Sequence, residues 1–97
     1  MKFAIGQVVH HRRYGFRGVV AAIDKACAAD DDWYGRKVTQ PRRDQAWYHV
    51  LRHEGQEHYV AEENLEPDPT GDAVDHPYVE RMFPTFLNGR YYRESLN

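Results

Sequence analysis

This chain of 97 residues contains a turn that is rich in arginine and aromatic residues, and these side chains could bind a ligand. Arg12, Arg13 and Arg17 surround Tyr14 and Phe16. A guanidinium binds phosphate or carboxylate through two parallel hydrogen bonds and also stacks on rings. The turn therefore predicts a contact with nucleic acid or with an acidic protein. The alternative is that the two rings close the end of a small β-barrel, while the arginines only keep it in solution.

A second basic group lies in residues 25–44, a long segment between two strand candidates. Lys37, Arg42 and Arg43 follow Trp33 in this insert. Connections of this length in compact domains usually carry function. The candidate binding residues therefore come from both basic groups, and they are Arg12, Arg13, Tyr14, Arg17, Lys37, Arg42 and Arg43.

Charge is divided unevenly along the chain, although the formal net charge is only −2. Residues 1–43 carry nine Lys and Arg against four Asp, a net of +5. Residues 44–97 carry four Arg against eleven Asp and Glu, a net of −7. The division favours a basic face for nucleic acid or an acidic protein, unless the two signs interleave in the folded chain.

The six histidines raise the question of a metal site. His49 and His53 are predicted to share one face of an extended strand, with His58 across the following hairpin. No cysteine or carboxylate stands beside them at a zinc-type spacing. We therefore expect no metal and no cofactor.

The sequence shows no sign of catalysis. Cys27, the single cysteine, lies among alanines after an apolar strand, which indicates a structural thiol. Gly-rich phosphate loops and the serine-hydrolase motif are missing. We expect a protein that is not an enzyme. Because a lone cysteine suits a reducing compartment and no apolar run is long enough for a membrane helix or signal peptide, we also expect a cytoplasmic protein without a membrane partner.

The elements that position these residues are predicted to be short strands. The candidates are residues 7–12, 18–24, 46–52 and 57–61. Residues 18–24 are apolar on both faces, which is typical of a central strand. Strict alternation places Val19, Ala21 and Ile23 on one face and Val20 and Ala22 on the other.

Short turns are predicted for the C-terminal third of the chain. Residues 62–65 form one helical turn, and Asp75 caps a short helix that begins near Pro77. Pro84 kinks or restarts this helix, and residues 90–93 return in extended form. The apolar side chains of this segment either pack back over one open end of the barrel or meet a second chain.

Taken together, the short strands and closely spaced turns predict one all-β domain over residues 1–97. The expected architecture is a small SH3-like barrel with a long insert after the second strand and short C-terminal helical turns.

Three blocks of the sequence resemble the YccV-like, or HspQ, family. They are IGQVVHHRRYGFRGVV at residues 5–20, WYHVL at residues 47–51 and YVAEENL at residues 59–65. The blocks occur in the same order as in the family, and the resemblance covers almost the whole chain. Bacterial members are heat-shock proteins, and eukaryotic members occur as a domain in some F-box proteins.

The resemblance implies an SH3-like barrel that binds and does not catalyse. It implies hemimethylated DNA as one partner. It also implies an ATP-dependent protease of the Lon type and its substrates, for which the domain is an adaptor in the heat-shock response. Self-association is implied as well, with a trimer as the described form. The alternative is a general protein–protein interaction domain with no DNA role.

The two implied roles make different demands on this chain. DNA affinity needs several phosphate contacts, which in a mildly acidic chain must come from a local basic patch. An adaptor needs only a protein-binding surface. The sequence by itself therefore favours the adaptor as the biological role. The family supplies no contact residues, so the basic residues named above come from the charge pattern alone.

Overall fold

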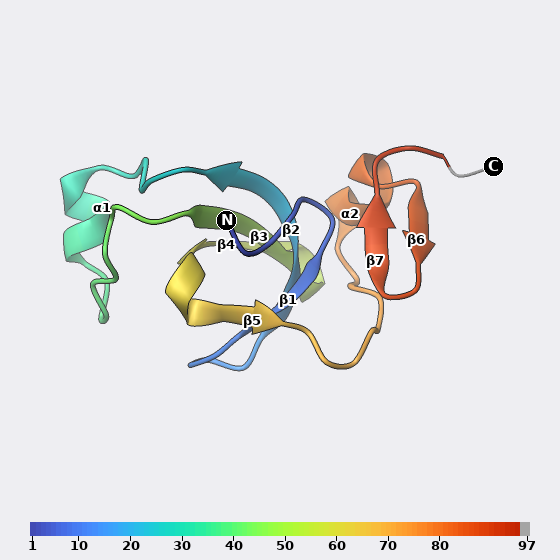
Figure 1. The fold of residues 1–97 in the computed structure, drawn as a ribbon, viewed down its shortest axis with the longest axis horizontal. Coiled ribbons are helices and arrows are strands. Elements are labelled where there is room, and N and C mark those ends of the chain that lie inside the picture. Colours follow the sequence, from blue (N-terminus) through green and yellow to red (C-terminus); the bar gives the residue numbers. More distant parts are fainter. Residues whose placement is uncertain (96–97) are drawn as a thin grey trace.

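The longest strand, β2 (Arg17–Asp24), lies at the centre of the sheet in the computed structural model, which describes residues 1–95. The sheet has five strands in the order β4-β3-β2-β1-β5, and all neighbours are antiparallel (Figure 1). The other strands are β1 (Val8–His11), β3 (Trp47–Arg52), β4 (Gln56–Ala61) and β5 (Leu65–Pro67). The predicted central strand is thus confirmed.

A β-bulge in β2 bends the sheet. The pairing of β2 with β3 shifts register between Val20 and Ala22, which leaves Ala21 as the extra residue. One extra residue disrupts the ladder and reverses the alternation of side chains beyond it. Ile23 therefore packs against the same cluster as Val20, on the face opposite to the one that strict alternation predicts.

The chain order of the strands is that of an SH3-like barrel, and the predicted all-β fold is confirmed. The 3-10 turn η1 (His53–Gly55) joins β3 to β4, and η2 (Glu62–Asn64) leads into β5, which pairs back with β1. The sequence did not predict β5. The sheet is strongly bent. Within residues 1–95 no pairing joins β4 to β5, so both of these strands remain edges.

Each face of the sheet buries its own apolar cluster. The inner cluster consists of Phe3, Val9, Val20, Ala46, Tyr48, Val50, Val60 and Leu65. The outer cluster joins Val8, Val19, Ala21 and Leu51 of the sheet to Val74, Val79, Phe83 and Tyr91 of the C-terminal segment. The C-terminal segment therefore packs in cis, and it covers the outer face of the sheet and not an open end of the barrel.

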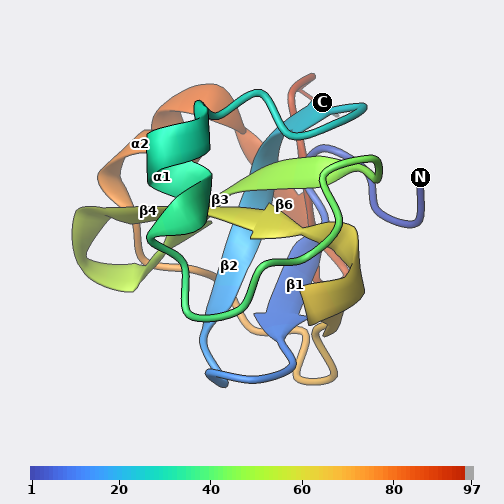
Figure 2. The ribbon, with the colours of Figure 1, turned by 90° about the vertical axis from the view of Figure 1, so that its left-hand side faces the viewer.

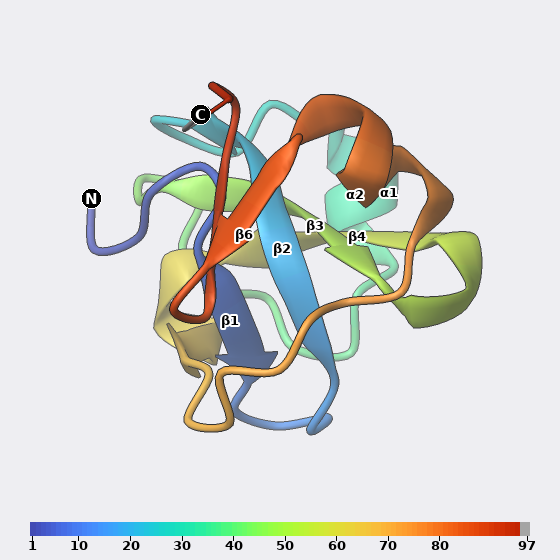
Figure 3. The same cartoon turned by 90° about the vertical axis from the view of Figure 1, so that its right-hand side faces the viewer.

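The C-terminal segment consists of α2 (Pro77–Met82) and a hairpin of β6 (Thr85–Leu87) and β7 (Arg90–Tyr92), which lies in front of β2 in Figure 3. The side chain of His76, and not the predicted Asp75, caps α2 by accepting a hydrogen bond from the Tyr78 amide. The helix that was predicted to restart after Pro84 is instead β6.

Gly6 lets the N-terminal segment lie directly against this hairpin. Its φ is +91°, and a Cβ on it would lie 2.1 Å from the carbonyl oxygen of Tyr91. The Gly6 carbonyl in turn accepts a hydrogen bond from the Tyr91 amide at 2.9 Å. Only glycine satisfies both the backbone conformation and the close approach.

Arg17 ties the loop after β5 to the start of β2. Its Nε and Nη2 each donate to the Asp68 carboxylate at 2.9 Å, and the Asp68 side chain is only 1% exposed. Burial by itself would raise the pKa of Asp68, but the hydrogen bonds from Arg17 and Thr70 and the Arg17 charge outweigh it and lower the pKa to about 2. The ion pair therefore stabilises the fold at neutral pH.

We expect Asp68→Asn to lower the free energy of unfolding at pH 7 by about 2 kcal/mol, because a carboxyl whose pKa falls on folding stabilises the folded state above its unfolded pKa. The deficit should shrink as the pH falls from about 4 toward 2, where the wild-type carboxyl takes up its proton. Urea unfolding of both proteins across this range measures it. Asp44→Asn, in an exposed pair with Arg42, is the control and should change stability little. Equal stability of Asp68→Asn and wild type at pH 7 would contradict the assignment.

Candidate functional site

An open groove of about 390 Å³ lies at the end of the molecule opposite the C-terminal hairpin. It is lined by Tyr14 and Phe16 of the β1–β2 turn, by Trp33 and residues 37–39 of the insert, and by residues 57–61 of β4. We call it the aromatic groove. Figure 2 looks at this end, where the insert crosses in front of β3 and β4. Three segments far apart in the sequence therefore build one concavity.

The insert forms one wall of the groove, and a short helix holds it in shape. In α1 (Asp31–Gly35), the Asp30 side chain caps the first turn by accepting a hydrogen bond from the Trp33 amide at 2.8 Å. The Trp33 ring contacts the rings of Trp47 and Tyr59 edge to face, with centroids 6.1 and 5.6 Å away. Capping thus orients an aromatic side chain over β4.

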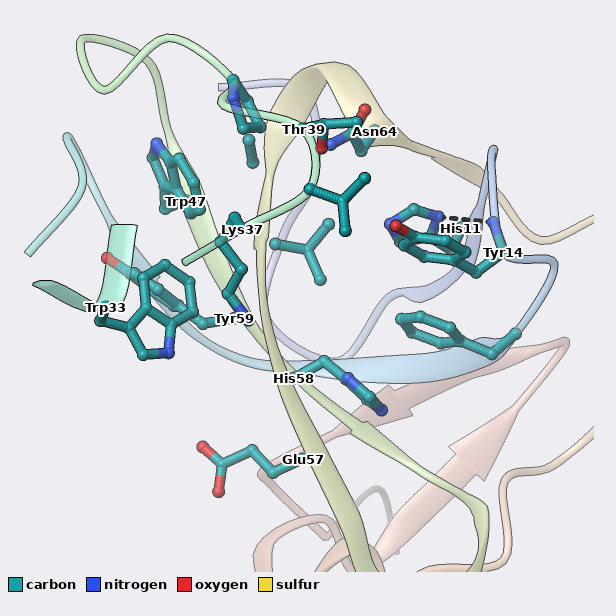
Figure 4. Close-up of a pocket in the computed structure, with 15 residues that line it drawn as sticks. His11, Tyr14, Trp33, Lys37, Thr39, Trp47, Glu57, His58, Tyr59 and Asn64 are labelled. Carbon is teal, nitrogen blue, oxygen red and sulfur yellow. Dashed lines mark hydrogen bonds between the residues drawn. The ribbon is translucent and has the colours of Figure 1, made fainter. Parts of the chain in front are cut away.

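The β1–β2 turn forms the opposite wall as a column of stacked rings (Figure 4). The centroid of His11 lies 4.8 Å from that of Tyr14 and 4.9 Å from that of Phe16, and Phe16 stacks on His58 at 4.5 Å. The Nδ1 of His11 accepts hydrogen bonds from the amides of Arg13 and Tyr14. His11 therefore fixes the turn that presents Tyr14, whose side chain is 60% exposed, to the groove.

Tyr59 of β4 lies on the same side of the groove as Trp33, where a polar network holds it (Figure 4). Its hydroxyl donates to Asp24 Oδ2 at 2.6 Å and accepts from the Ala28 amide. Burial, together with the hydrogen bond to Asp24, raises the pKa of Tyr59 to about 12. The ring is therefore neutral and fixed, and it packs against the rings of Trp33, Trp47 and His49.

Positive charge near the groove comes from Arg13 of the β1–β2 turn, Lys37 of the insert and Arg52 at the end of β3. Burial lowers the pKa of His58, and the nearby charges of Arg52 and Lys37 lower it further. Burial likewise lowers the pKa of His11, with smaller contributions from His58, His10 and Arg13. Both groove histidines are consequently neutral at pH 7, and the positive potential there comes from arginine and lysine.

The structure brings only some of the predicted binding residues to the groove. Tyr14 and Lys37 line it, and Arg13 lies beside it, 5.8 Å from the Tyr14 ring centroid. The other four are within 4.0 Å of carboxylates of the chain itself, in the pairs Arg12–Glu66, Arg17–Asp68, Arg42–Asp44 and Arg43–Asp31. The predicted cluster of Arg12, Arg13 and Arg17 is therefore divided between neutralised and unpaired side chains.

Sequence reasoning missed Arg52, whose guanidinium lies 4.8 Å over the Phe16 ring and within 3.4 Å of His58 Nε2. The signal for it is the strand register, because Arg52 pairs with Gly18 directly after the arginine-rich turn. A Cβ at Gly18 would lie 2.7 Å from the Leu51 carbonyl oxygen, so the backbones approach closely here.

The histidines are not arranged as predicted. His53 does not share a strand face with His49, because β3 ends at Arg52 and His53 begins η1, where its Nδ1 accepts a hydrogen bond from the Asp75 amide. His49 instead contacts Asp24 and Glu57, at 3.2 and 3.6 Å. Among residues 1–95, no three histidine, cysteine or acidic side chains are grouped so as to hold a metal ion. Nor does any helix in this part of the chain have the length and hydropathy to cross a membrane.

Comparison with known proteins gives one family and a set of longer relatives. Residues 1–90 match the family model described as "Hemimethylated DNA-binding protein YccV like". F-box only protein 21 of Mus musculus is 32% identical over 92 residues, and the Homo sapiens and Pongo abelii proteins of that name are 30% identical. The match covers 92% of this chain but only 15% of each relative. All segments of the groove lie inside the matched region.

The groove histidines predict a pH dependence of stability. A histidine whose pKa is lowered on folding binds its proton better in the unfolded chain, so stability is complete above about pH 6.5 and is lost as the pH falls below it. We expect His58→Gln to lose less free energy of unfolding than wild type between pH 7.5 and 5.5, as measured by urea unfolding. Parallel pH curves for the two proteins would show that His58 is not desolvated in the groove.

Proposed function

Because the chain belongs to the YccV-like family of hemimethylated DNA-binding proteins, we propose that it is a DNA-binding module whose contact surface is the aromatic groove. The observation that carries the proposal is that Arg13, Lys37 and Arg52 each lie beside a ring that lines the groove, Tyr14, Trp33 and Phe16 respectively. Within residues 1–95, none of these three side chains has a carboxylate within 4.0 Å. The proposed role is binding, without catalysis.

Cations that have no carboxylate partner gain the most from contact with DNA phosphates. Each phosphate contact releases condensed counterions from DNA, which supplies much of the affinity. An arginine already paired with a carboxylate, such as Arg17 or Arg42, offers less of this gain, because it must first leave its partner. The formal net charge of −2 makes the rest of the surface unfavourable for DNA. The location of the unpaired cations therefore supports the groove as the face that meets the duplex.

The aromatic rings of the groove can contact the bases of DNA, whereas the cations contact its phosphates. Lys37 Nζ lies 4.1 Å over the Trp33 ring, and the Tyr14 ring is open to solvent on the other side of the groove. Aromatic faces stack on bases of any sequence, and guanidinium groups extend such stacks. Cations and rings thus occur together in a way that suits nucleic acid better than an uncharged peptide.

We expect Lys37→Gln and Arg52→Gln each to weaken binding of a hemimethylated duplex, because each removes one cation from the groove. Each should also lower the slope of log affinity against log salt by about one. Fluorescence anisotropy at several salt concentrations measures both effects.

Arg90→Gln is the matched control, because it removes the same charge from β7 at the opposite end of the molecule. Arg42→Gln is a second control, which removes a guanidinium already paired with Asp44. If all four variants lose equal affinity, the contact is not localised to the groove. If wild type binds no duplex, the module does not bind DNA.

A second candidate function is the protease adaptor in the heat-shock response, and a separate surface favours it. Tyr78, Phe86 and Leu87 of the C-terminal segment are 55%, 39% and 49% exposed. Apolar side chains left open in this way are typical of protein contact surfaces. We propose that an ATP-dependent protease of the Lon type, its substrates or further copies of this chain in a trimer meet the domain here, in the cytoplasm.

For the adaptor role, we expect the wild-type domain to speed the degradation of casein by a Lon-type protease. Leu87→Ser should abolish the stimulation, because it removes an exposed apolar contact. Val38→Ser is the matched control, since Val38 is 84% exposed but lies on the insert. Equal stimulation by both variants, or none by wild type, would refute the adaptor surface.

A further inference from the structure

We propose that the aromatic groove receives a single methylated base that has been unstacked from the duplex, an inference that rests on the DNA-binding function proposed above. The ligand class is thus an extruded nucleobase with its flanking phosphates. The groove combines the shape, the rings, the polar edge and the charge that such a ligand needs.

The shape of the groove suits an extruded base better than a paired one. Side chains that read bases inside a duplex stand on a protruding helix or β-ribbon that enters the major groove. The aromatic groove is concave, with β4 between the insert and the β1–β2 turn. A convex duplex cannot bring a paired base down to β4, whereas a base rotated out of the stack can reach it. A volume of about 390 Å³ is also within the range of about 300–1,000 Å³ for small-molecule pockets.

Aromatic rings stand on both sides of the groove. Trp33 and Tyr59 lie on one side of the groove in Figure 4, and Tyr14 and His11 lie on the other. A base between two aromatic walls recovers the stacking that it gives up on leaving the duplex. Val38, which lines the groove and is 84% exposed, adds apolar surface against which a methyl group is more favourable than in water.

The groove also offers hydrogen-bonding groups to the polar edge of a base. As an edge strand, β4 has backbone donors and acceptors that face away from β3. Among residues 1–95, no hydrogen bond joins the β4 backbone to the groove walls. The side chains of Thr39 and Asn64 also line the groove. The hydrogen-bonding edge of a base therefore finds donors and acceptors, which an apolar slot would not offer.

Lys37 links the base to its phosphates. Its ammonium lies over the Trp33 ring and is exposed. Insertion of a base against Trp33 replaces this cation–π contact with a stacking contact. The displaced ammonium then reaches the phosphate beside the extruded nucleotide. The anionic ligand thus exchanges one interaction of Lys37 for another, and an uncharged occupant would gain nothing from this exchange.

The experiment compares duplexes that differ only in how firmly the target base is paired. Two probe sets carry N6-methyladenine or 5-methylcytosine on one strand, opposite either the normal partner or an abasic site. We expect one methylated base to be preferred, and its abasic-partner duplex to bind about tenfold more tightly than the paired duplex, because unpairing then costs less.

Groove variants identify where the base is held. Tyr14→Leu and Trp33→Leu should reduce the preference for the abasic-partner duplex, and Tyr14 is exposed enough that its loss does not endanger the fold. Tyr78→Leu, an exposed tyrosine of α2, should keep the preference. Circular dichroism confirms that each variant is folded.

The possible outcomes distinguish base extrusion from DNA binding in general. Equal affinity for paired and abasic-partner duplexes would overturn base extrusion and leave DNA binding in place. Absence of binding to every duplex would overturn both. Competition for the groove by an anionic peptide, with no preference among duplexes, would assign the same surface to a protein partner and overturn the inference.

Discussion

The domain depends on burying both faces of β2. Val19 and Val20 are fully buried, yet they point to opposite clusters. The bend at Ala21 lets the sheet cover its own inner face, but a five-stranded sheet cannot also hide its outer face. The C-terminal segment performs that task. Because the core is completed at that end, the β4 edge and the insert remain free to build a groove at the other.

Electrostatics then distinguish the groove from the rest of an acidic surface. Four of the arginines, Arg12, Arg17, Arg42 and Arg43, lie within 4.0 Å of carboxylates, and the buried pair of Arg17 with Asp68 is part of the fold. Arg13, Lys37 and Arg52 are left beside the rings of Tyr14, Trp33 and Phe16. Burial, with smaller contributions from the charges of Arg52 and Lys37, lowers the pKa of His58, so the positive potential comes from groups that do not titrate near neutrality. The local arrangement of charge, and not the net charge, makes a nucleic-acid contact physically reasonable.

The sequence predicted the fold class and part of the groove, and the reasons for its failures are physical. A strand that is apolar on both faces must be central, so β2 was recognised, but nothing local marks the bulge at Ala21. Strand β5 is short and is stabilised by its distant partner β1, which no local pattern reveals. Tyr14 and Lys37 were found because the turn and the insert stand out in composition. Arg52 depends on strand register, and the neutralisation of Arg17 depends on a residue 51 positions away.

The central claim is that DNA meets this domain at the aromatic groove. The most direct measurement is a titration of the ¹⁵N-labelled domain with a short hemimethylated duplex, followed through its backbone amide resonances. The account predicts changes concentrated in residues 11–17, 33–41 and 52–64, with the hairpin of residues 85–92 unaffected. Changes centred on that hairpin, or none anywhere at saturating duplex, would contradict it.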